Sequence, residues 1–327
     1  MALVTVIAVI AFTVSCAATR LLIGALRRRA VLDLPNERSS HVVPTPRGGG
    51  IAVIGVSVVG WLALVAGGIA PPRAVPVVLV AAGLALVSWF DDLGGLSPGI
   101  RLLAQFVAVA AGVWALPRGA IFPGWLLELD AIAVALTWVW FVNLFNFMDG
   151  IDGIDGSEAT AIGLGIVLVA SAGGGVDLSI AAPAAAIAAA ALGFLVWNWA
   201  PARIFLGDVG SVPLGYMLGF LLFELALRGQ WQAALILPLY FLADASLTLL
   251  RRLLRGERVW QAHREHFYQR AVQSGLSHDA VVLRVIAANI VLIACALVAT
   301  KGWGFAGLAV AATTVLALLV ELGRRRR

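Results

Sequence analysis

The sequence predicts an all-α integral membrane protein, a polytopic bundle of about eleven transmembrane helices. Composition is the first sign. Of the 327 residues, 61% are hydrophobic and 13% are charged, and the mean hydropathy is +0.97; charged residues make up about 25% of an ordinary soluble domain. The second sign is a series of apolar runs of about 17 to 25 residues, each able to cross a hydrocarbon core as a helix. Short charged or Gly/Pro-rich breaks separate these runs.

The predicted spans follow the apolar runs in chain order and leave no room for a soluble domain, so residues 1–327 are expected to form a single membrane domain. The first run is too long for a cleaved signal peptide and is expected to remain as a helix. Both cysteines fall inside spans, which argues against a disulfide framework. The spans lie near residues 3–25, 49–68, 74–90, 101–117, 131–147, 158–173, 179–198, 211–227, 233–250, 281–299 and 302–321.

The distribution of arginine predicts the orientation, because basic residues in short loops stay on the cytoplasmic side. One set of breaks contains most of the arginines, including the cluster in 251–270 and the tail 324–327. The other set contains only Arg73, Arg118, Arg228 and Lys301. With an odd number of spans, the N-terminus is expected outside and the C-terminus inside. The basic inner face would attract anionic headgroups or substrates, whereas the chain has no separate basic domain for nucleic acid.

Five polar segments are then expected on the cytoplasmic side, together with all four histidines. They are residues 35–50, 90–99, 146–156, 198–211 and 251–278. The outer loops are short and contain few polar groups, except for the longer segment 117–130. The sequence therefore predicts an active site on the cytoplasmic face of the bundle.

The pair Asp91 and Asp92 follows the third span directly. Adjacent residues of a helix point about 100° apart, so the two carboxylates need not serve the same partner. One reading is a solvated helix end. The other is that one carboxylate faces the bundle, where an ionisable group is costly and usually has a partner.

The segment NFMDGIDGIDG contains three more aspartates. Asn146, Asp149 and Asp152 recur every third residue, and glycines between them would let backbone approach a ligand closely. The alternative is that this segment is only a flexible turn. Asp155 is expected to cap the helix that follows.

Two further segments complete the pattern. Asp208 begins the eighth span between two glycines, where a carboxylate could bind Mg²⁺ or could simply cap the helix. The basic loop places His263 and His266 three residues apart among arginines, which suit phosphate binding. Two histidines alone do not make a zinc site, and this loop could instead anchor to lipid headgroups. The common phosphate-binding and nucleophile motifs of soluble enzymes are absent from the sequence.

Taken in order, PNERSSHVVPTPRGGG, DDLGG, NFMDGIDG, FLGDVGS and the histidine loop resemble the polyprenyl-phosphate N-acetylhexosamine-1-phosphate transferase family, a branch of glycosyltransferase family 4. The resemblance covers about Asp33 to Gly275. It implies transfer of an N-acetylated aminosugar 1-phosphate from a UDP-sugar to undecaprenyl phosphate, with release of UMP, in a bacterial inner membrane. Mg²⁺ is the implied cofactor, with Mn²⁺ as a substitute, and a homodimer stays open as an alternative to a monomer.

The resemblance also implies site residues. Asp208 matches the Mg²⁺ ligand. The implied catalytic residues are Asp91, Asp92, Asp149, Asp152 and His263. The implied substrate-binding residues are Asn146, Gly150, Ile151, Phe205, Arg38, His41, Arg264 and His266.

This chain departs from the family pattern in its histidine loop. It reads HREH where common-antigen enzymes have a denser cluster, and it lacks the triple histidine of the MurNAc-pentapeptide branch. It is therefore more similar to the O-antigen-initiating branch, and the MurNAc-pentapeptide branch remains an alternative.

The implied chemistry is attack of the lipid phosphate on the β-phosphorus of the UDP-sugar, which needs positioning and charge neutralisation. Because a phosphate monoester is already largely ionised at neutral pH, we expect Asp91 and Asp92 to position groups, although the resemblance attaches a base role to Asp91. A covalent aspartyl-phosphate route stays open. The rival class is a transporter of lipid-linked sugars or ions, which would place charges near mid-bilayer; Glu224 and Asp244 are the main acids inside spans.

Overall fold

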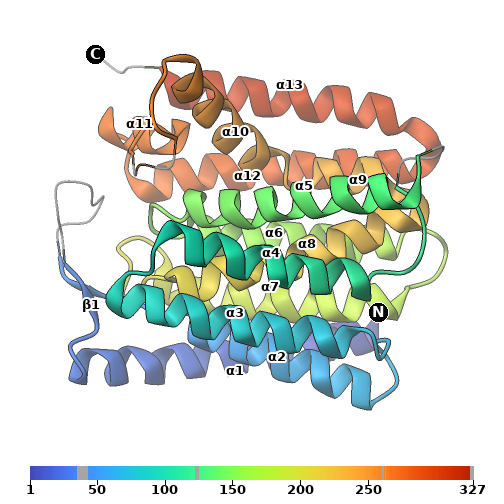
Figure 1. Ribbon diagram of the computed structural model, residues 1–327, viewed down its shortest axis with the longest axis horizontal. Coiled ribbons are helices and arrows are strands. Elements are labelled where there is room, and N and C mark those ends of the chain that lie inside the picture. Colours follow the sequence, from blue (N-terminus) through green and yellow to red (C-terminus); the bar gives the residue numbers. More distant parts are fainter. Residues whose placement is uncertain (35–42, 122–124, 260, 262, 325–327) are drawn as a thin grey trace.

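The computed structural model is a bundle of helices that lie side by side along the long axis of the molecule (Figure 1). It describes residues 1–34, 43–121, 125–259, 261 and 263–324. The longer helices are α1 (Ala2–Arg28), α2 (Gly50–Ala66), α3 (Ala74–Gly94), α4 (Pro98–Ala115), α5 (Leu127–Met148), α6 (Ile154–Ala170), α7 (Leu178–Asn198), α8 (Asp208–Leu225), α10 (Leu239–Leu254), α12 (His278–Val298) and α13 (Gly304–Gly323). Shorter elements are η1 (Ala226–Gln230), α9 (Trp231–Ile236), α11 (Phe267–Gln273) and η2 (Ala299–Trp303).

These helices lie where the sequence predicts spans. Within the described residues, seven helical segments are long and apolar enough to cross a membrane, and α2 is a shorter apolar helix. The chain is thus a polytopic, helical membrane protein. One predicted span is wrong as a single helix, because 233–250 is divided between α9 and α10 at Pro238. Proline lacks the N–H that a continuous helix needs, and its ring clashes with the preceding turn.

The centre of the bundle is formed by α7 and α8, which are buried along most of their length. Both are apolar on all sides, as expected of helices surrounded by other helices. In α7 the small side chains allow neighbours to approach closely; a Cβ on Gly193 would lie 2.5 Å from the Phe12 carbonyl oxygen of α1. The outer helices instead expose large aliphatic side chains, as a lipid-facing surface requires.

A small sheet departs from the predicted all-α fold. Strands β1 (Leu32–Asp33) and β2 (Thr45–Pro46) pair antiparallel, with Leu32 opposite Pro46. The next residue, Arg47, forms an isolated parallel bridge with Phe205. This bridge therefore brings the segment before α2 against the segment before α8.

The connections alternate between the two ends of the bundle, and the five polar segments all fall at the same end. This polar end comprises the loops before α2, α4, α6, α8 and α12, at the left of Figure 1. The chain begins at the opposite end and finishes at the polar end. The predicted gathering of the polar loops on one side is thus confirmed.

The helices α2 and α8 meet at the polar end through two glycines. A Cβ on Gly50 would lie 2.1 Å from the Gly210 Cα and 2.3 Å from the Gly210 nitrogen. Because these atoms are backbone, only a shift of a whole helix could relieve the overlap. Gly50 therefore determines how closely α2 approaches the first turn of α8.

We expect Gly50→Ala to lower the midpoint of thermal unfolding in detergent, with an overpacking cost of about 1–3 kcal/mol. Gly55→Ala is the matched control, because Gly55 is on the same helix and a Cβ there meets no atom within 4 Å. The control should be neutral or stabilising by up to about 1 kcal/mol, from the better helix propensity of alanine. Equal midpoints for the two variants would contradict the close packing.

Candidate active site

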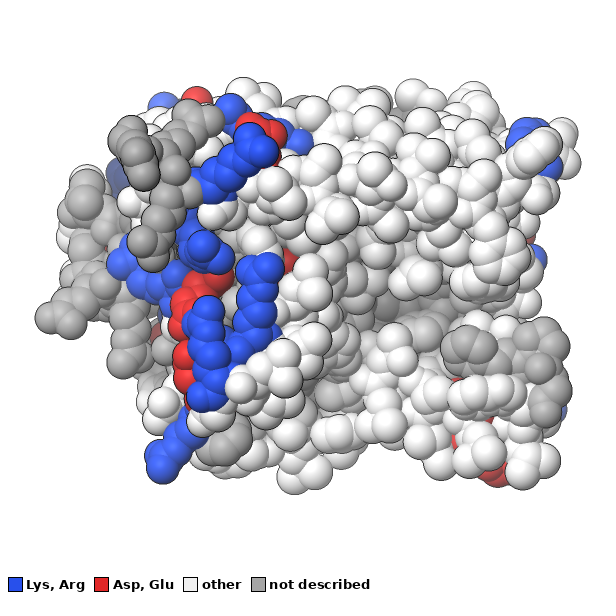
Figure 2. Space-filling model, turned by 90° about the horizontal axis from the view of Figure 1, so that it is seen from above, with Lys and Arg blue, Asp and Glu red and all other residues white. Residues whose placement is uncertain are grey.

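The polar end gathers most of the charge of the molecule. Figure 2 shows Lys and Arg side chains crowded at this end with acidic side chains between them, and a broad uncharged middle. Such a pattern suits a protein that is surrounded by lipid over its middle and meets an anionic surface or ligand at one end. The candidate site lies here.

The carboxylate of Asp92 binds the first turn of α8. Its two oxygens accept the backbone N–H groups of Asp208 at 3.1 Å and of Val209 at 3.0 Å. A guanidinium nitrogen of Arg47 lies 2.9 Å from the same carboxylate, whose side chain is 2% exposed. A helix N-terminus has unpaired N–H groups and favours an anion. Asp92 therefore anchors α8, and its oxygens are already engaged.

Asp208, the first residue of α8, extends its carboxylate between two arginines. Its Oδ1 accepts from Arg47 at 2.9 Å, and its Oδ2 lies 3.9 Å from Arg101. Gly207 precedes it with a φ of +76°, and a Cβ there would lie 2.8 Å from an Asp92 oxygen. Glycine at this position therefore permits the tight approach that presents Asp208 to the site.

Asp91 faces a different partner from its neighbour Asp92. It accepts the Leu96 N–H at 2.5 Å, and its other oxygen lies 3.2 Å from Arg101. The two adjacent carboxylates thus have different partners, which their helical spacing had left open. Asp91 thus shapes the α3–α4 loop and holds Arg101 beside Asp208.

The end of α5 supplies amides and a further carboxylate. The Asn146 amide donates to the Ser211 hydroxyl at 2.8 Å, which ties α5 to α8. Burial raises the pKa of Asp149 to about 7; Asp208 and Asp92 act in the same direction, and Arg47 opposes them. Asp149 is therefore buried close to two other carboxylates and to Arg47.

These groups line a cavity of about 210 Å³ between α3, α4, α5 and α8. Carboxylate, guanidinium and amide groups form one part of its wall, and aliphatic side chains form the rest. The polar lining residues are Ser88, Asp91, Arg101, Gln105, Asn143, Asn146 and Asp208. A site of this kind can take an anionic group that carries an apolar substituent.

The donor chemistry fits a divalent cation bound together with substrate. Within the described ranges, no three His, Cys, Asp or Glu side chains already form a metal-binding group. Mg²⁺ usually takes one or two carboxylates and completes its shell with phosphate oxygens and water. Asp208, with Asp149 nearby, offers that partial set.

The DGIDG segment is a tightly packed turn that other segments hold in place, not a flexible one. A Cβ on Gly150 would lie 2.2 Å from the Tyr268 hydroxyl. Gly153, with a φ of +82°, donates its N–H to Asn198 at 2.9 Å. Asp152 accepts the Ala202 N–H at 3.0 Å. Its other neighbour, His278, lies 3.3 Å from the same Asp152 oxygen.

The structure differs from two expectations for this segment. The prediction that Asp155 caps α6 is wrong: Gly153 holds the N-cap position, and the Asp155 side chain is buried inside the bundle. Ile151, expected to touch substrate, is 6% exposed and belongs to the hydrophobic core. The chain turns inward here, so both side chains point away from solvent.

The histidine loop is held by Asp244, an acid inside α10. This carboxylate accepts the backbone N–H groups of Phe267 at 3.0 Å and of Tyr268 at 3.3 Å, the first turn of α11. The His266 ring lies 3.1 Å from it, and His266 is 2% exposed. Asp244, an acid inside a predicted span, therefore anchors the start of α11. His266 belongs to that anchor, with little surface left for a ligand.

The other predicted residues of this region differ in exposure and placement. Burial lowers the pKa of His263 to about 4, and His266 and Arg252 act in the same direction, so His263 is neutral near pH 7. Arg264 is half-buried, and its carbonyl accepts from Gln273 at 2.8 Å. Phe205 contributes its backbone, accepting from Gly49 at 2.8 Å. Arg38 and His41 lie outside the described residues.

Sequence reasoning missed Arg47, Arg101 and His278 as partners of the aspartates. The polar segments that contain Arg47 and His278 were recognised, but pairs 161 or 126 residues apart cannot be read from spacing. The sequence did contain one signal of a buried contact, Asp244, because an acid within an apolar span usually has a partner. Glu224 follows the same rule at the opposite end, paired with Arg73 at 2.6 Å and Arg228 at 2.8 Å.

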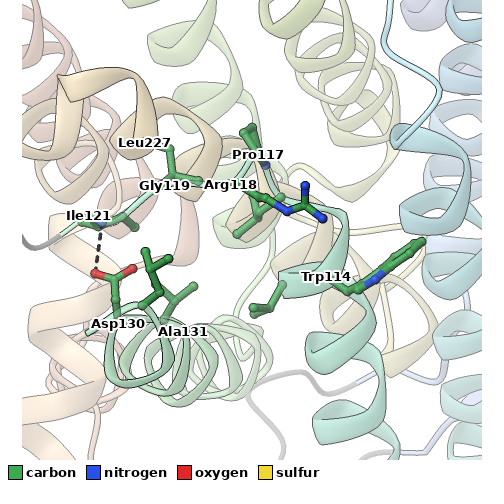
Figure 3. A pocket seen from close by; sticks show the side chains of 12 residues that line it. Trp114, Pro117, Arg118, Gly119, Ile121, Asp130, Ala131 and Leu227 are labelled. Carbon is green, nitrogen blue, oxygen red and sulfur yellow. Dashed lines mark hydrogen bonds between the residues drawn. The ribbon is translucent and has the colours of Figure 1, made fainter. Parts of the chain in front are cut away.

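A cavity of about 240 Å³ lies at the opposite end, between α4, α5 and η1 (Figure 3). Its carboxylate, Asp130, accepts the Ile121 N–H at 3.0 Å and so holds the α4–α5 connection. Trp114 and Arg118 lie at the rim, and Leu227 closes one side. The polar groups here stabilise a loop, so the polar end remains the better candidate.

Comparisons with known proteins point to one family. Residues 74–226 match the profile described as glycosyl transferase family 4. The chain is 29% identical to a probable undecaprenyl-phosphate N-acetylglucosaminyl 1-phosphate transferase of Bacillus subtilis, over 84% of this chain and 80% of that protein. It is 30% identical to a decaprenyl-phosphate N-acetylglucosaminephosphotransferase of Mycolicibacterium smegmatis, over 79% and 72%. A phospho-N-acetylmuramoyl-pentapeptide-transferase of Streptococcus thermophilus is 31% identical over 47% of each chain.

We predict that Mg²⁺ raises the thermal-unfolding midpoint of the wild-type protein and has much less effect on Asp208→Asn. Asparagine keeps the size of the side chain but removes the anion that Mg²⁺ needs. A ligand that binds the folded state raises the free energy of unfolding by an amount that grows with the ligand concentration relative to its Kd. Asp279→Asn, at the start of α12 at the same end, is the control and should respond like the wild type. An equal Mg²⁺ response in Asp208→Asn would show that Asp208 does not bind Mg²⁺.

Proposed function

Because this chain belongs to glycosyl transferase family 4, we propose that it transfers an N-acetylated aminosugar 1-phosphate from a UDP-sugar to undecaprenyl phosphate, releasing UMP. The observation that supports this most directly is the cavity at the polar end, where Asp208 lies between Arg47 and Arg101. Carboxylates for a divalent cation and guanidiniums for phosphate are together at the end of a lipid-embedded bundle.

In the proposed reaction, an oxygen of the lipid phosphate forms a bond to the β-phosphorus of the UDP-sugar. The bond from that phosphorus to the oxygen shared with the α-phosphate breaks, and UMP leaves with the electron pair. Phosphoryl transfer of this kind depends mainly on in-line positioning and electrostatic stabilisation. When bound, Mg²⁺ would neutralise charge on the pyrophosphate oxygens, and Asp208 would hold it.

The contacts of the other groups suggest positioning roles. The guanidinium of Arg101 lines the cavity and lies 3.9 Å from Asp208, so it can donate to a phosphate oxygen that enters. Both oxygens of Asp91 are engaged, by Leu96 and by Arg101. Since the acceptor phosphate is already largely ionised near pH 7, we assign Asp91 to positioning and not to proton removal.

We propose the donor sugar from the names of the relatives that this chain resembles. The relatives that match over most of their length are named for N-acetylglucosamine, whereas the muramoyl-pentapeptide relative of Streptococcus matches over 47% of its length. We therefore take UDP-N-acetylglucosamine as the first donor to test, followed by related N-acetylated deoxysugars. The lipid-linked product would begin a cell-surface glycan such as O-antigen.

The transporter alternative is less well supported by the contacts. A transporter would use free charges near mid-bilayer. Here Asp244 anchors α11, and Glu224 is paired with two arginines near the opposite end. These two acids are therefore structural, and the cavity with Asp208 lies at one end.

We predict that purified protein releases UMP from UDP-N-acetylglucosamine only when undecaprenyl phosphate and Mg²⁺ or Mn²⁺ are both present. Asp208→Asn should lower kcat by about 10²- to 10³-fold, because losing electrostatic stabilisation of a transition state costs about 3–4 kcal/mol. Asp279→Asn should keep most of the wild-type rate. UMP release without lipid acceptor, or full turnover in excess EDTA, would contradict the proposal; a panel of UDP-sugars identifies the donor.

The charge distribution predicts orientation in a bacterial inner membrane. The arginine-rich polar end should face the cytoplasm, with the C-terminus inside and the N-terminus in the periplasm. A reporter fused to the C-terminus should therefore report a cytoplasmic location, and one inserted at Gly174, in the loop between α6 and α7, a periplasmic one. Both reporters on the same side would overturn this topology.

A further inference from the structure

Arg20 is a charged residue within the first predicted span. It belongs to α1, the blue helix at the lower edge of Figure 1, which ends at the polar end of the bundle. It lies about 12 Å along the helix axis from Arg28 at the end of α1. Arg20 and its neighbour Leu21 are both exposed on the outer surface. An arginine at such a position is costly without a partner, so the partner indicates what the residue is for.

The contact that Arg20 makes is with the Trp197 ring of α7. Its guanidinium carbon lies 5.5 Å from the ring centroid, and the guanidinium carbon of Arg203 lies 5.6 Å from the same centroid. Because both distances end at one point, the two guanidiniums lie at most about twice that distance apart. Among the described residues, no carboxylate forms an ion pair with either arginine. Two positive charges are therefore gathered at one ring without a protein anion.

The tryptophan beside the two arginines is fixed by contacts between α1 and α7. Its indole N–H donates to the Cys16 carbonyl oxygen at 3.0 Å. The Ser15 hydroxyl donates to the Ala190 carbonyl oxygen at 2.7 Å and joins the same two helices. The backbone N–H of Arg203 donates to the Trp197 carbonyl oxygen at 2.8 Å. Packed helices and a hydrogen-bonded helix end therefore present the two guanidiniums.

The two arginines lie where a phospholipid would place its headgroup. Trp197 is in the last turn of α7, and Arg203 is in the polar-end segment that follows. Tryptophan is typical of the membrane–water interface, and basic groups between helices on the cytoplasmic side bind anionic headgroups. On the outer surface of α7, Leu192 and Val196 are 42% and 54% exposed, which suits acyl chains. Charge, position and apolar surface together fit an anionic phospholipid.

We propose that Arg20 and Arg203 bind the phosphate of one anionic phospholipid at the junction of α1 and α7, with the Trp197 ring beside both guanidiniums. A guanidinium presents paired N–H donors that match phosphate oxygens. None of these three residues lines the cavity with Asp208, so this lipid is a structural ligand and not the acceptor. A lipid bound here would fasten the segment between α7 and α8, which leads to Asp208.

The first experiment counts bound lipids. The full-length protein in detergent is titrated with palmitoyl-oleoyl phosphatidylglycerol, and native mass spectrometry follows the most tightly bound lipid. Arg20→Gln and Arg203→Gln should each weaken its affinity about tenfold, as expected for the loss of a charged hydrogen-bond partner. The double variant should lose this same single lipid. Loss of two lipids in the double variant, one for each arginine, would overturn the shared site.

Arg27→Gln is the matched control, because Arg27 is exposed on the same helix at the same end. It removes the same charge and should change the affinity much less. An equal loss would mean a diffuse attraction of the basic end to anionic lipid and would refute the site. Palmitoyl-oleoyl phosphatidylcholine, which has no net charge, should bind more weakly than phosphatidylglycerol to the wild type, and equal binding of the two lipids would also refute it.

The second experiment measures stability. Phosphatidylglycerol should raise the midpoint of thermal unfolding of the wild type and of Arg27→Gln, and should raise that of Arg20→Gln much less, because a ligand stabilises the state that binds it. Sodium phosphate should not replace the lipid. An equal rise with inorganic phosphate would assign the two arginines to a soluble anion and contradict the proposal. Neither measurement requires turnover, so a failure of the lipid site and a failure of the transferase function are distinguishable.

Discussion

The contact between the Asp92 carboxylate and the first turn of α8 is the constraint on which the site depends. One buried anion satisfies two backbone N–H groups of α8 and balances the charge of Arg47. These groups come from α3, from the segment after β2 and from α8. Removing the anion would leave two N–H groups at the start of α8 without their partner and Arg47 with Asp208 alone, and an unpaired polar group in a protein interior is costly. The position of Asp208 follows from this contact.

A second buried carboxylate performs the same task for the basic loop. Asp244 holds the start of α11, and α11 in turn places Tyr268 against the DGIDG turn, with its hydroxyl 3.3 Å from the Phe147 carbonyl oxygen. The close approach at Gly150 leaves no space for a side chain there. Two aspartates thus act through backbone to assemble the surroundings of the cavity, and Asp208 remains for the proposed binding of Mg²⁺.

The cavity at this end suits an amphiphilic substrate. Charged and amide groups form one part of its wall, and aliphatic side chains form the rest. A lipid phosphate has the same division between head and chain. Because the cavity lies at the end of the bundle, a sugar nucleotide would approach from the aqueous side while the lipid stays in the membrane.

The sequence alone determined the helical membrane class and the gathering of five polar segments on one side. Each apolar run is long enough to cross the membrane, so successive loops lie at opposite ends of the bundle. It also identified Asp208 as a carboxylate at a helix start. Only the tertiary structure decided that Asp91 and Asp92 have separate partners, that Asp155 and Ile151 are buried, and that Pro238 divides a predicted span. These outcomes depend on contacts such as Arg47 with Asp208, 161 residues apart, or Asp92 with Val209, 117 apart. Spacing along the chain predicts which residues share a helix face, but which helices pack together is decided by the fit of whole surfaces.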